Sequence, residues 1–215
     1  MKVGVFDSGV GGLSVANAIK KSLPQLEIEL REDKEHVPYG TRRPSEILEF
    51  VRPIFQQMID DGCRVIVIAC NTVSTTLTPE LRRLFDVPLI AVEPMVKYAA
   101  KLTRSGTIIV CATPVTLASP RYHYLKSRYA RELTVLEPDC HDWAHMIQHN
   151  EIDEEKIRAR LEAALSKNAD VIVLGCTHYH WIEQEIKTIA DKRAQVIQPE
   201  PIVVQQLKQL LAQLA

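Results

Sequence analysis

The feature that most constrains the fold of this chain is the alternation of short apolar runs with longer amphipathic segments. Runs such as residues 3–6 and 65–69 are rich in Val and Ile and have the length of a strand, whereas residues 13–23 and 44–61 place apolar side chains at helical spacing. Nearly continuous apolar runs are typical of strands buried on both faces of a parallel sheet. The sequence therefore predicts an α/β fold with parallel sheets and crossover helices.

The same pattern predicts where individual elements lie. The helix over residues 44–61 should end at Gly62 and bend at Pro53. At residues 78–80 a threonine stands before a proline, which is typical of a helix start, so we expect a helix to begin there. Strands are expected at residues 3–6, 26–30, 65–69, 89–92, 107–112, 133–136 and 171–174.

Two segments about half a chain apart resemble each other. Residues 64–72 and residues 170–178 each contain a buried-strand pattern, a small residue, a cysteine and a polar pair. Buried strands are commonly rich in Val and Ile, so similarity in those residues alone is weak evidence of a repeat. The shared cysteine at the carboxyl end of each strand favours a structural repeat. We therefore expect two similar α/β lobes, which contribute Cys70 and Cys176 to an active site in the cleft between them. The predicted lobes comprise residues 1–93 with 198–215, and residues 94–197.

The positions of Cys70 and Cys176 suit acid–base chemistry. Ligands of open parallel sheets bind beyond the carboxyl ends of the strands, where both cysteines are expected. A helix that begins just after each cysteine would present free N–H groups and the positive end of its dipole, which favour a thiolate. Such sites can lower a thiol pKa from about 8.5 by several units, so that the group takes and returns a proton near neutrality. The other cysteines are expected to be small buried hydrophobic residues: Cys63, Cys111 and Cys140.

Charge and cysteine content exclude several classes of function. The chain has 26 basic and 27 acidic residues, a balance that does not favour nucleic acid or an anionic membrane as the main partner. Its five cysteines include no C-x-x-C pair, which argues against a disulfide scaffold or a zinc knuckle and for free thiols in a reducing compartment. We expect no signal peptide at residues 1–6 and no membrane span, because the longest apolar runs have only strand length.

Polar and glycine residues follow the first predicted strand. Asp7 and Ser8 precede the glycine-rich residues 9–12, a turn that would expose backbone N–H groups to a carboxylate or a phosphate. Taken alone, Asp7 is as typical of a turn or helix-cap residue as of a functional residue. The turn is not a dinucleotide fingerprint, because Ser14 replaces the third glycine and no P-loop lysine follows. A nucleotide-binding α/β protein is therefore a disfavoured alternative.

Six segments together resemble the glutamate racemases, within the aspartate/glutamate racemase superfamily. The first and last of them are highly specific motifs, and the others gain weight in combination. The resemblance implies an amino-acid racemase, an isomerase that uses neither pyridoxal phosphate nor any other cofactor nor a metal. The segments are spread over most of the chain in the order found in the family, at residues 4–14, 37–40, 69–72, 92–94, 112–116 and 174–179.

The resemblance also implies roles for individual residues. Cys70 and Cys176 would act as acid and base on opposite faces of the substrate Cα, with Asp7 assisting Cys70 and His178 assisting Cys176. Asp33 falls at the acidic position that precedes the Pro-Tyr-Gly motif in the family. Contacts to the amino acid are implied for Asp7, Ser8, Tyr39, Gly40, Asn71, Thr72, Thr113, Thr116, Thr177 and His178.

A biological setting follows from the same resemblance. The substrate would be glutamate, and the D-glutamate formed would supply peptidoglycan synthesis, and with it cell-wall biogenesis and cell shape. The resemblance implies a cytoplasmic protein with no nucleic-acid or membrane partner, and a homodimer as the expected assembly.

Several positions depart from the family pattern. Gln148 stands where a glutamate usually supports the second cysteine, His180 follows Tyr179 in place of a proline, and Gln198 replaces an aspartate. Two alternatives to a glutamate racemase therefore stay open. One is a racemase of another acidic or related amino acid, and the other is a weakly active binding protein that retains the racemase fold.

Overall fold

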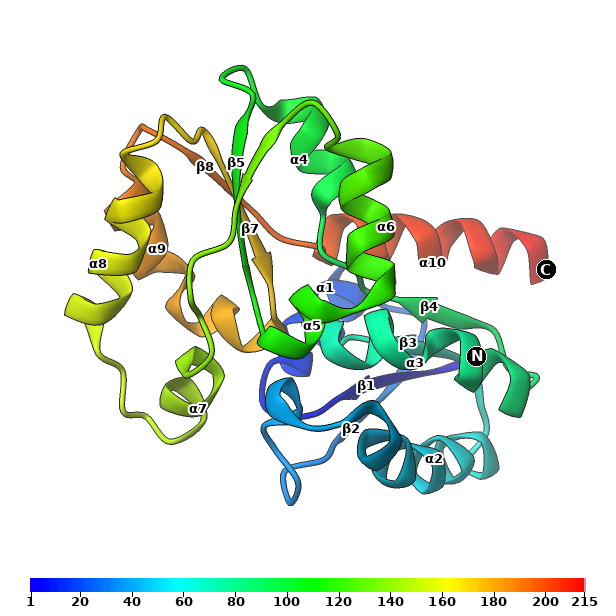
Figure 1. Ribbon diagram of the computed structural model, residues 1–215. Helices are drawn as coiled ribbons and strands as arrows, with labels where there is room; N and C mark the ends of the chain where they lie inside the picture. Colours follow the sequence, from blue (N-terminus) through cyan, green and yellow to red (C-terminus); the bar gives the residue numbers. More distant parts are fainter. Residues whose placement is uncertain (215) are drawn as a thin grey trace.

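Two four-stranded parallel sheets form the framework of the computed structural model, which describes residues 1–214 (Figure 1). The first sheet has the strand order β2-β1-β3-β4, and its strands are β1 (Lys2–Asp7), β2 (Glu27–Glu32), β3 (Cys63–Ile68) and β4 (Leu89–Ala91). The second has the equivalent order β6-β5-β7-β8, with β5 (Thr107–Ala112), β6 (Thr134–Leu136), β7 (Val171–Gly175) and β8 (Gln195–Ile197). The matching strand orders confirm the predicted fold of two similar α/β lobes.

Helices cover the faces of both sheets (Figure 1). In the first half of the chain they are α1 (Gly12–Ser22), the short 3-10 helix η1 (Tyr39–Thr41), α2 (Pro44–Asp60), α3 (Asn71–Leu84) and α4 (Val96–Leu102). In the second half they are α5 (Pro114–Ala118), α6 (Pro120–Tyr129), α7 (Trp143–Gln148), α8 (Glu154–Leu165), the 3-10 helix η2 (Thr177–Ile182), α9 (Glu183–Ala190) and α10 (Glu200–Leu214). Within residues 1–214, no helix is both long enough and apolar enough to cross a membrane.

The C-terminal helix returns to the lobe in which the chain began. Val203 and Leu207 of α10 are buried in the same cluster as Val3 of β1 and Val15 of α1. The strands of the second sheet lie between these two parts of the sequence, so the chain passes between the lobes twice. The predicted lobe boundaries at residues 93 and 198 stay a prediction, although this return of α10 supports them.

The central strands β1, β3, β5 and β7 were the most readily predictable, because they are buried on both faces. All six residues of β5 are buried, as are five of the six in β1. The seven strands that the sequence predicts are present, with ends that differ by one or two residues. The prediction omitted β8, a strand of three residues whose run of apolar side chains is too short to stand out.

The predicted helix start at residues 78–80 is wrong. Helix α3 begins at Asn71, directly after Cys70, and Pro79 lies in its interior. The hydroxyl of Thr78 donates to the carbonyl of Ser74 at 2.7 Å, and the helix continues past the proline, which has no N–H to donate. A threonine before a proline is a common local signal for a helix start, but here the helix already begins where β3 ends, at Asn71.

Three phenylalanines pack together in the core of the first lobe: Phe6, Phe55 and Phe85. Phe55 is fully buried, and its ring centroid lies 5.2 Å from that of Phe6 and 5.8 Å from that of Phe85. We expect Phe55→Ala to lower the free energy of unfolding by about 3–5 kcal/mol, because it removes buried area and leaves a cavity. Leu84→Ala, at an exposed position, should change it by less than about 0.5 kcal/mol. Urea unfolding followed by circular dichroism measures both, and equal effects would contradict the core assignment.

Candidate active site

Cys70 and Cys176 occupy equivalent positions in the two lobes. Cys70 follows β3 and is the N-cap of α3, and Cys176 follows β7 and is the N-cap of η2. Both thiols line one internal cavity with a free volume of only about 10 Å³. Its lining residues are Ser8, Pro38, Tyr39, Gly40, Cys70, Asn71, Thr72, Thr113, Ala144, Cys176, Thr177 and His178.

The structure thus brings together nearly all of the residues that the sequence singled out. Asp7 and Thr116 do not line the cavity but lie behind lining residues, in hydrogen bonds to Thr177 and to Thr72. The sequence prediction missed two lining residues, Pro38 and Ala144. Pro38 belongs to the motif at residues 37–40 and could have been found there, whereas nothing in the sequence marks Ala144.

Asp7 connects the two lobes beneath the cavity. Its carboxylate accepts a hydrogen bond from Thr177 Oγ1 at 2.9 Å and another from the backbone N–H of Gly9 at 3.1 Å. Full burial raises the pKa of Asp7 to about 7, against the lowering effect of these hydrogen bonds. Asp7 can therefore gain or lose a proton near neutral pH.

The glycine-rich turn packs against Asp7 and the Cys176 loop. The N–H of Gly9 donates to the carboxylate of Asp7. A Cβ atom on Gly11 would lie 2.5 Å from the backbone carbon of Thr177, and one on Gly9 would lie 2.7 Å from Nε2 of His178. The glycines therefore allow the turn of the first lobe to approach the Cys176 loop of the second.

The thiol of Cys70 is buried and close to Ser8. The Ser8 Oγ and Cys70 Sγ atoms lie 3.3 Å apart, and backbone N–H groups of Thr72 and Val73 reach the sulfur from the start of α3. Burial and the nearby charge of Asp7 outweigh these donors and raise the pKa of Cys70 to about 11. The expected lowering of the thiol pKa is thus wrong for the closed protein, because the helix start does not compensate for lost hydration.

Cys176 has a matching environment with different neighbours. Burial, and then the charge of Cys70, raise its pKa well above the ordinary value of a thiol. Its sulfur lies 4.0 Å from Nδ1 of His178, whose Nε2 lies 3.0 Å from Oε1 of Gln148. A hydrogen on Nε2 is donated to Gln148, which leaves Nδ1 as an acceptor facing the thiol. Burial lowers the pKa of His178 to about 4, so the imidazole is neutral at pH 7.

Hydroxyl and amide groups line the remainder of the site. Thr72 of the first lobe lies 3.1 Å from Thr113 and 3.3 Å from Thr116 of the second, measured between hydroxyl oxygens. The side chain of Asn71 is buried, and neither its amide nitrogen nor its oxygen has a partner among residues 1–214. Tyr39 donates its hydroxyl hydrogen to Asp33, which fixes the ring at the cavity wall. The site offers several donors and acceptors to a polar ligand.

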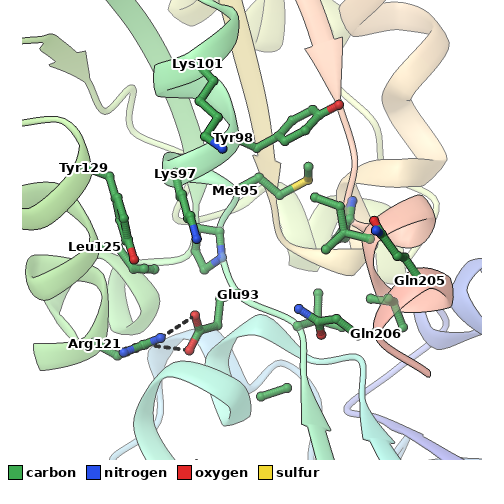
Figure 2. Close-up of a pocket in the computed structure, with 16 residues that line it drawn as sticks. Glu93, Met95, Lys97, Tyr98, Lys101, Arg121, Leu125, Tyr129, Gln205 and Gln206 are labelled. Carbon is green, nitrogen blue, oxygen red and sulfur yellow. Dashed lines mark hydrogen bonds and ion pairs between the residues drawn. The ribbon is translucent and has the colours of Figure 1, made fainter. Parts of the chain in front are cut away.

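A wider groove lies elsewhere between the lobes and contains neither thiol. Its volume is about 410 Å³, and α4, α6 and α10 supply most of its side chains (Figure 2). Arg121 is paired there with Glu93 through hydrogen bonds of 2.6 and 3.0 Å, drawn as dashed lines in Figure 2. The two cysteines that the sequence predicts to act as acid and base therefore line the small cavity and not this groove.

Fold and site together define a class of protein: an α/β enzyme of two parallel-sheet lobes, with one thiol from each lobe at the cleft. The chain belongs to the Asp/Glu/hydantoin racemase family, whose sequence profile matches residues 12–207. A glutamate racemase of Stutzerimonas stutzeri (strain A1501) is 37% identical over 216 residues, which cover 98% of this chain and 82% of that protein.

Solved structures agree with this assignment. Glutamate racemase of Escherichia coli, in complex with L-glutamate and the activator UDP-MurNAc-Ala, superposes with a TM-score of 0.90 at 30% identity, covering 98% of this chain and 82% of that chain. Glutamate racemase of Francisella tularensis, in complex with D-glutamate, superposes with a TM-score of 0.82 at 29% identity, covering 99% and 81%.

The opposite pKa shifts of Asp7 and His178 predict a distinctive pH dependence of stability. A raised carboxyl pKa gives stability that is present below pH 4 and lost as pH rises through 7, whereas a lowered imidazole pKa gives stability that is lost as pH falls from 6.5 towards 4. We expect the two effects, each about 2 kcal/mol between pH 5 and pH 8, to oppose each other in the wild type.

Single variants separate the two effects. His178→Asn should become less stable from pH 5 to pH 8, because Asp7 then dominates, and Asp7→Asn should become more stable over the same range. Urea unfolding at both pH values measures the slopes. Slopes of the same sign in the two variants would contradict the assigned shifts.

Proposed function

We propose that this chain is a glutamate racemase that interconverts L- and D-glutamate by cofactor-independent proton transfer between two thiols. The observation that carries the proposal is that Cys70 and Cys176, from different lobes, line the same buried cavity. The relative in Stutzerimonas stutzeri and the neighbours with L- and D-glutamate support glutamate as the substrate.

Two thiols on opposite sides of a Cα atom suffice for the reaction. One thiolate removes the α-proton, which leaves a carbanion, and the opposite thiol donates its proton to the other face of that carbon. The first cysteine ends as a thiol and the second as a thiolate, so each cysteine is the base in only one direction. Proton exchange with the surroundings then resets the pair.

Neighbouring groups must hold the protons that the thiols exchange. The raised thiol pKa values mean that both cysteines are protonated in the closed, empty protein at pH 7. The ammonium group of a bound amino acid would favour a thiolate, as an opposite charge does. Asp7, with a pKa of about 7, suits the proton of Cys70, and the neutral His178 suits the proton of Cys176.

Neutral donors replace a cofactor in stabilising the carbanion. The partnerless side chain of Asn71 and the regions of Ser8 and Thr177 would bind the α-carboxylate, where negative charge develops. The hydroxyls of Thr72, Thr113 and Thr116 form a second polar patch that suits the side-chain carboxylate. No cofactor is expected, and an absorbance band of a lysine–pyridoxal adduct in active protein would contradict that.

Direct assay tests the proposal and separates it from its alternatives. Purified protein is incubated with L-glutamate or D-glutamate without added cofactor, and the optical signal is followed by circular dichroism. Loss of signal from both enantiomers supports the proposal, whereas loss with aspartate alone indicates another acidic amino acid. Binding of glutamate without loss of signal indicates a binding protein, the alternative that the neutral Gln148 favours.

Serine substitutions test the role of each thiol. Cys70→Ser and Cys176→Ser should each reduce racemisation in both directions by at least about 10³-fold, because a hydroxyl is a poor acid or base for this step. Elimination from a substrate with a leaving group at Cβ needs only the base. Each variant should therefore keep elimination from one enantiomer and lose it from the other. Loss of the same enantiomer in both variants would contradict the two-base assignment.

Gln148 predicts an asymmetry between the two directions. A carboxylate at this position would face Nε2 of His178 and raise its pKa from about 4, so His178 would accept the proton of Cys176 more readily. We expect Gln148→Glu to increase elimination in the direction that uses Cys176 as base by about tenfold, with little change in the other. Gln198→Glu, outside the cavity lining, serves as the control. An equal effect of Gln148→Glu on both directions would show that Gln148 does not act through Cys176.

Several biological inferences rest on this activity. D-glutamate formed by the chain would enter peptidoglycan synthesis, and so support cell-wall biogenesis and cell shape. The expected cytoplasmic location and the homodimer stay predictions, and light scattering on the purified protein measures the second.

A further inference from the structure

The cavity that contains both thiols is too small, in this closed conformation, to hold an amino acid. A free volume of about 10 Å³ holds about one water molecule, so an amino acid can bind only if this cavity between the lobes widens. The contacts between the lobes therefore control access to both thiols. One of these contacts lies outside the cavity and next to the Cys176 loop.

His180 lies in η2, four residues after Cys176, and contacts two residues of other elements. Its Nδ1 atom lies 2.6 Å from Oε1 of Glu200 at the start of α10, and 2.9 Å from Oγ of Ser14 in α1. The hydroxyl of Ser14 donates to the carbonyl of Gly11 at 3.0 Å. Since a carboxylate can only accept, Nδ1 of His180 carries the hydrogen that Glu200 binds.

The three side chains join different lobes. Tyr179 and Ile182, on either side of His180, are buried in the core of the second lobe. Helices α1 and α10, which hold Ser14 and Glu200, pack in the core of the first lobe. The side chains of His180 and Glu200 are only 6% and 11% exposed, so their contact is shielded from solvent.

Charge favours the pair as well as geometry. Burial acts to raise the pKa of Glu200, but the hydrogen bond and the charge of His180 outweigh it, so the pKa lies below its ordinary value. A buried hydrogen-bonded pair is sensitive to the loss of one partner, because the polar group of the other is left unsatisfied. The pair is thus suited to hold the two lobes together, and it no longer does so when either side chain is removed.

We propose that His180 and Glu200, supported by Ser14, form a latch that holds the lobes closed and positions the Cys176 loop against the first lobe. His180 and Glu200 are positioning residues, because they act on Cys176 through the backbone of η2 and do not line the cavity.

Thiol alkylation tests the latch without any assay of activity. The purified protein is treated with iodoacetamide, and the rate at each of the five cysteines is measured by mass spectrometry. Cys70 and Cys176 are buried in the cavity between the lobes, whereas Cys63, Cys111 and Cys140 are buried outside its lining, in the cores of single lobes. The measured quantity is the rate at Cys70 or Cys176 divided by the rate at Cys111.

His180→Ala and Glu200→Ala should each raise both ratios by at least about tenfold, which corresponds to about 1.4 kcal/mol in the opening equilibrium. The double variant should show no more than the larger single effect, because the two residues act as a pair. Glu200→Gln should show a smaller increase, because its amide oxygen can still accept from His180. Ratios that stay at the wild-type value in the alanine variants overturn the proposal, and so does a general loosening that accelerates all five cysteines equally.

Asp170→Asn is the matched control. Asp170 also holds segments together through hydrogen bonds, to Thr103 and to the N–H groups of residues 104 and 105, but all of these lie in the second lobe before β7. Its ratios should match those of the wild type, and an increase as large as that in Glu200→Ala overturns the latch.

The consequence for catalysis rests on the proposed function, whereas the alkylation result does not. In the latch variants, kcat/KM for racemisation should fall in the order in which the alkylation ratios rise. If no variant or wild type racemises glutamate but the ratios change as expected, the proposed function fails and the latch stands. If racemisation occurs but the ratios do not change, the latch fails and the function stands.

Discussion

The hydrogen bond from Thr177 to Asp7 is the contact on which the geometry of this site depends. Asp7 ends β1, which pairs in parallel with β3, so its position also sets that of Cys70 just beyond β3. Thr177 is adjacent to Cys176 at the end of β7. Backbone hydrogen bonds to neighbouring strands fix β1 and β7 within their sheets, so this 2.9 Å bond between the ends of the two strands helps to set the position of one thiol relative to the other.

Burial sets the protonation of the site. It raises the pKa of Asp7 and of both thiols, and it lowers that of His178, because each group loses the hydration of its charged form. The closed protein consequently keeps both thiols protonated at neutral pH. The side-chain amide of Asn71, which has no partner among residues 1–214, lies at the wall of the same cavity.

Close approach of the lobes requires small residues and specific pairs. Gly9 and Gly11 leave space for the Cys176 loop, which any side chain at those positions would displace. His180 and Glu200 add a hydrogen-bonded contact at the edge of the same interface. The interface therefore contains close backbone contacts at two glycines as well as a contact between the side chains of His180 and Glu200. Both kinds of contact act on the backbone that carries Cys176.

Local sequence patterns were sufficient for the sheet strands, the repeat of two lobes and the pair of cysteines, because buried strands need continuous apolar runs and each cysteine follows such a run. They misplaced the start of α3, since Pro79 gives a start signal that the end of β3 overrides. They also gave the wrong direction for the thiol pKa values, because hydration depends on the packing of the opposite lobe. The inclusion of Ala144 in the cavity, the pairing of His178 with Gln148 and the closure of the cleft were decided by tertiary structure alone, since each depends on residues brought together from distant parts of the chain.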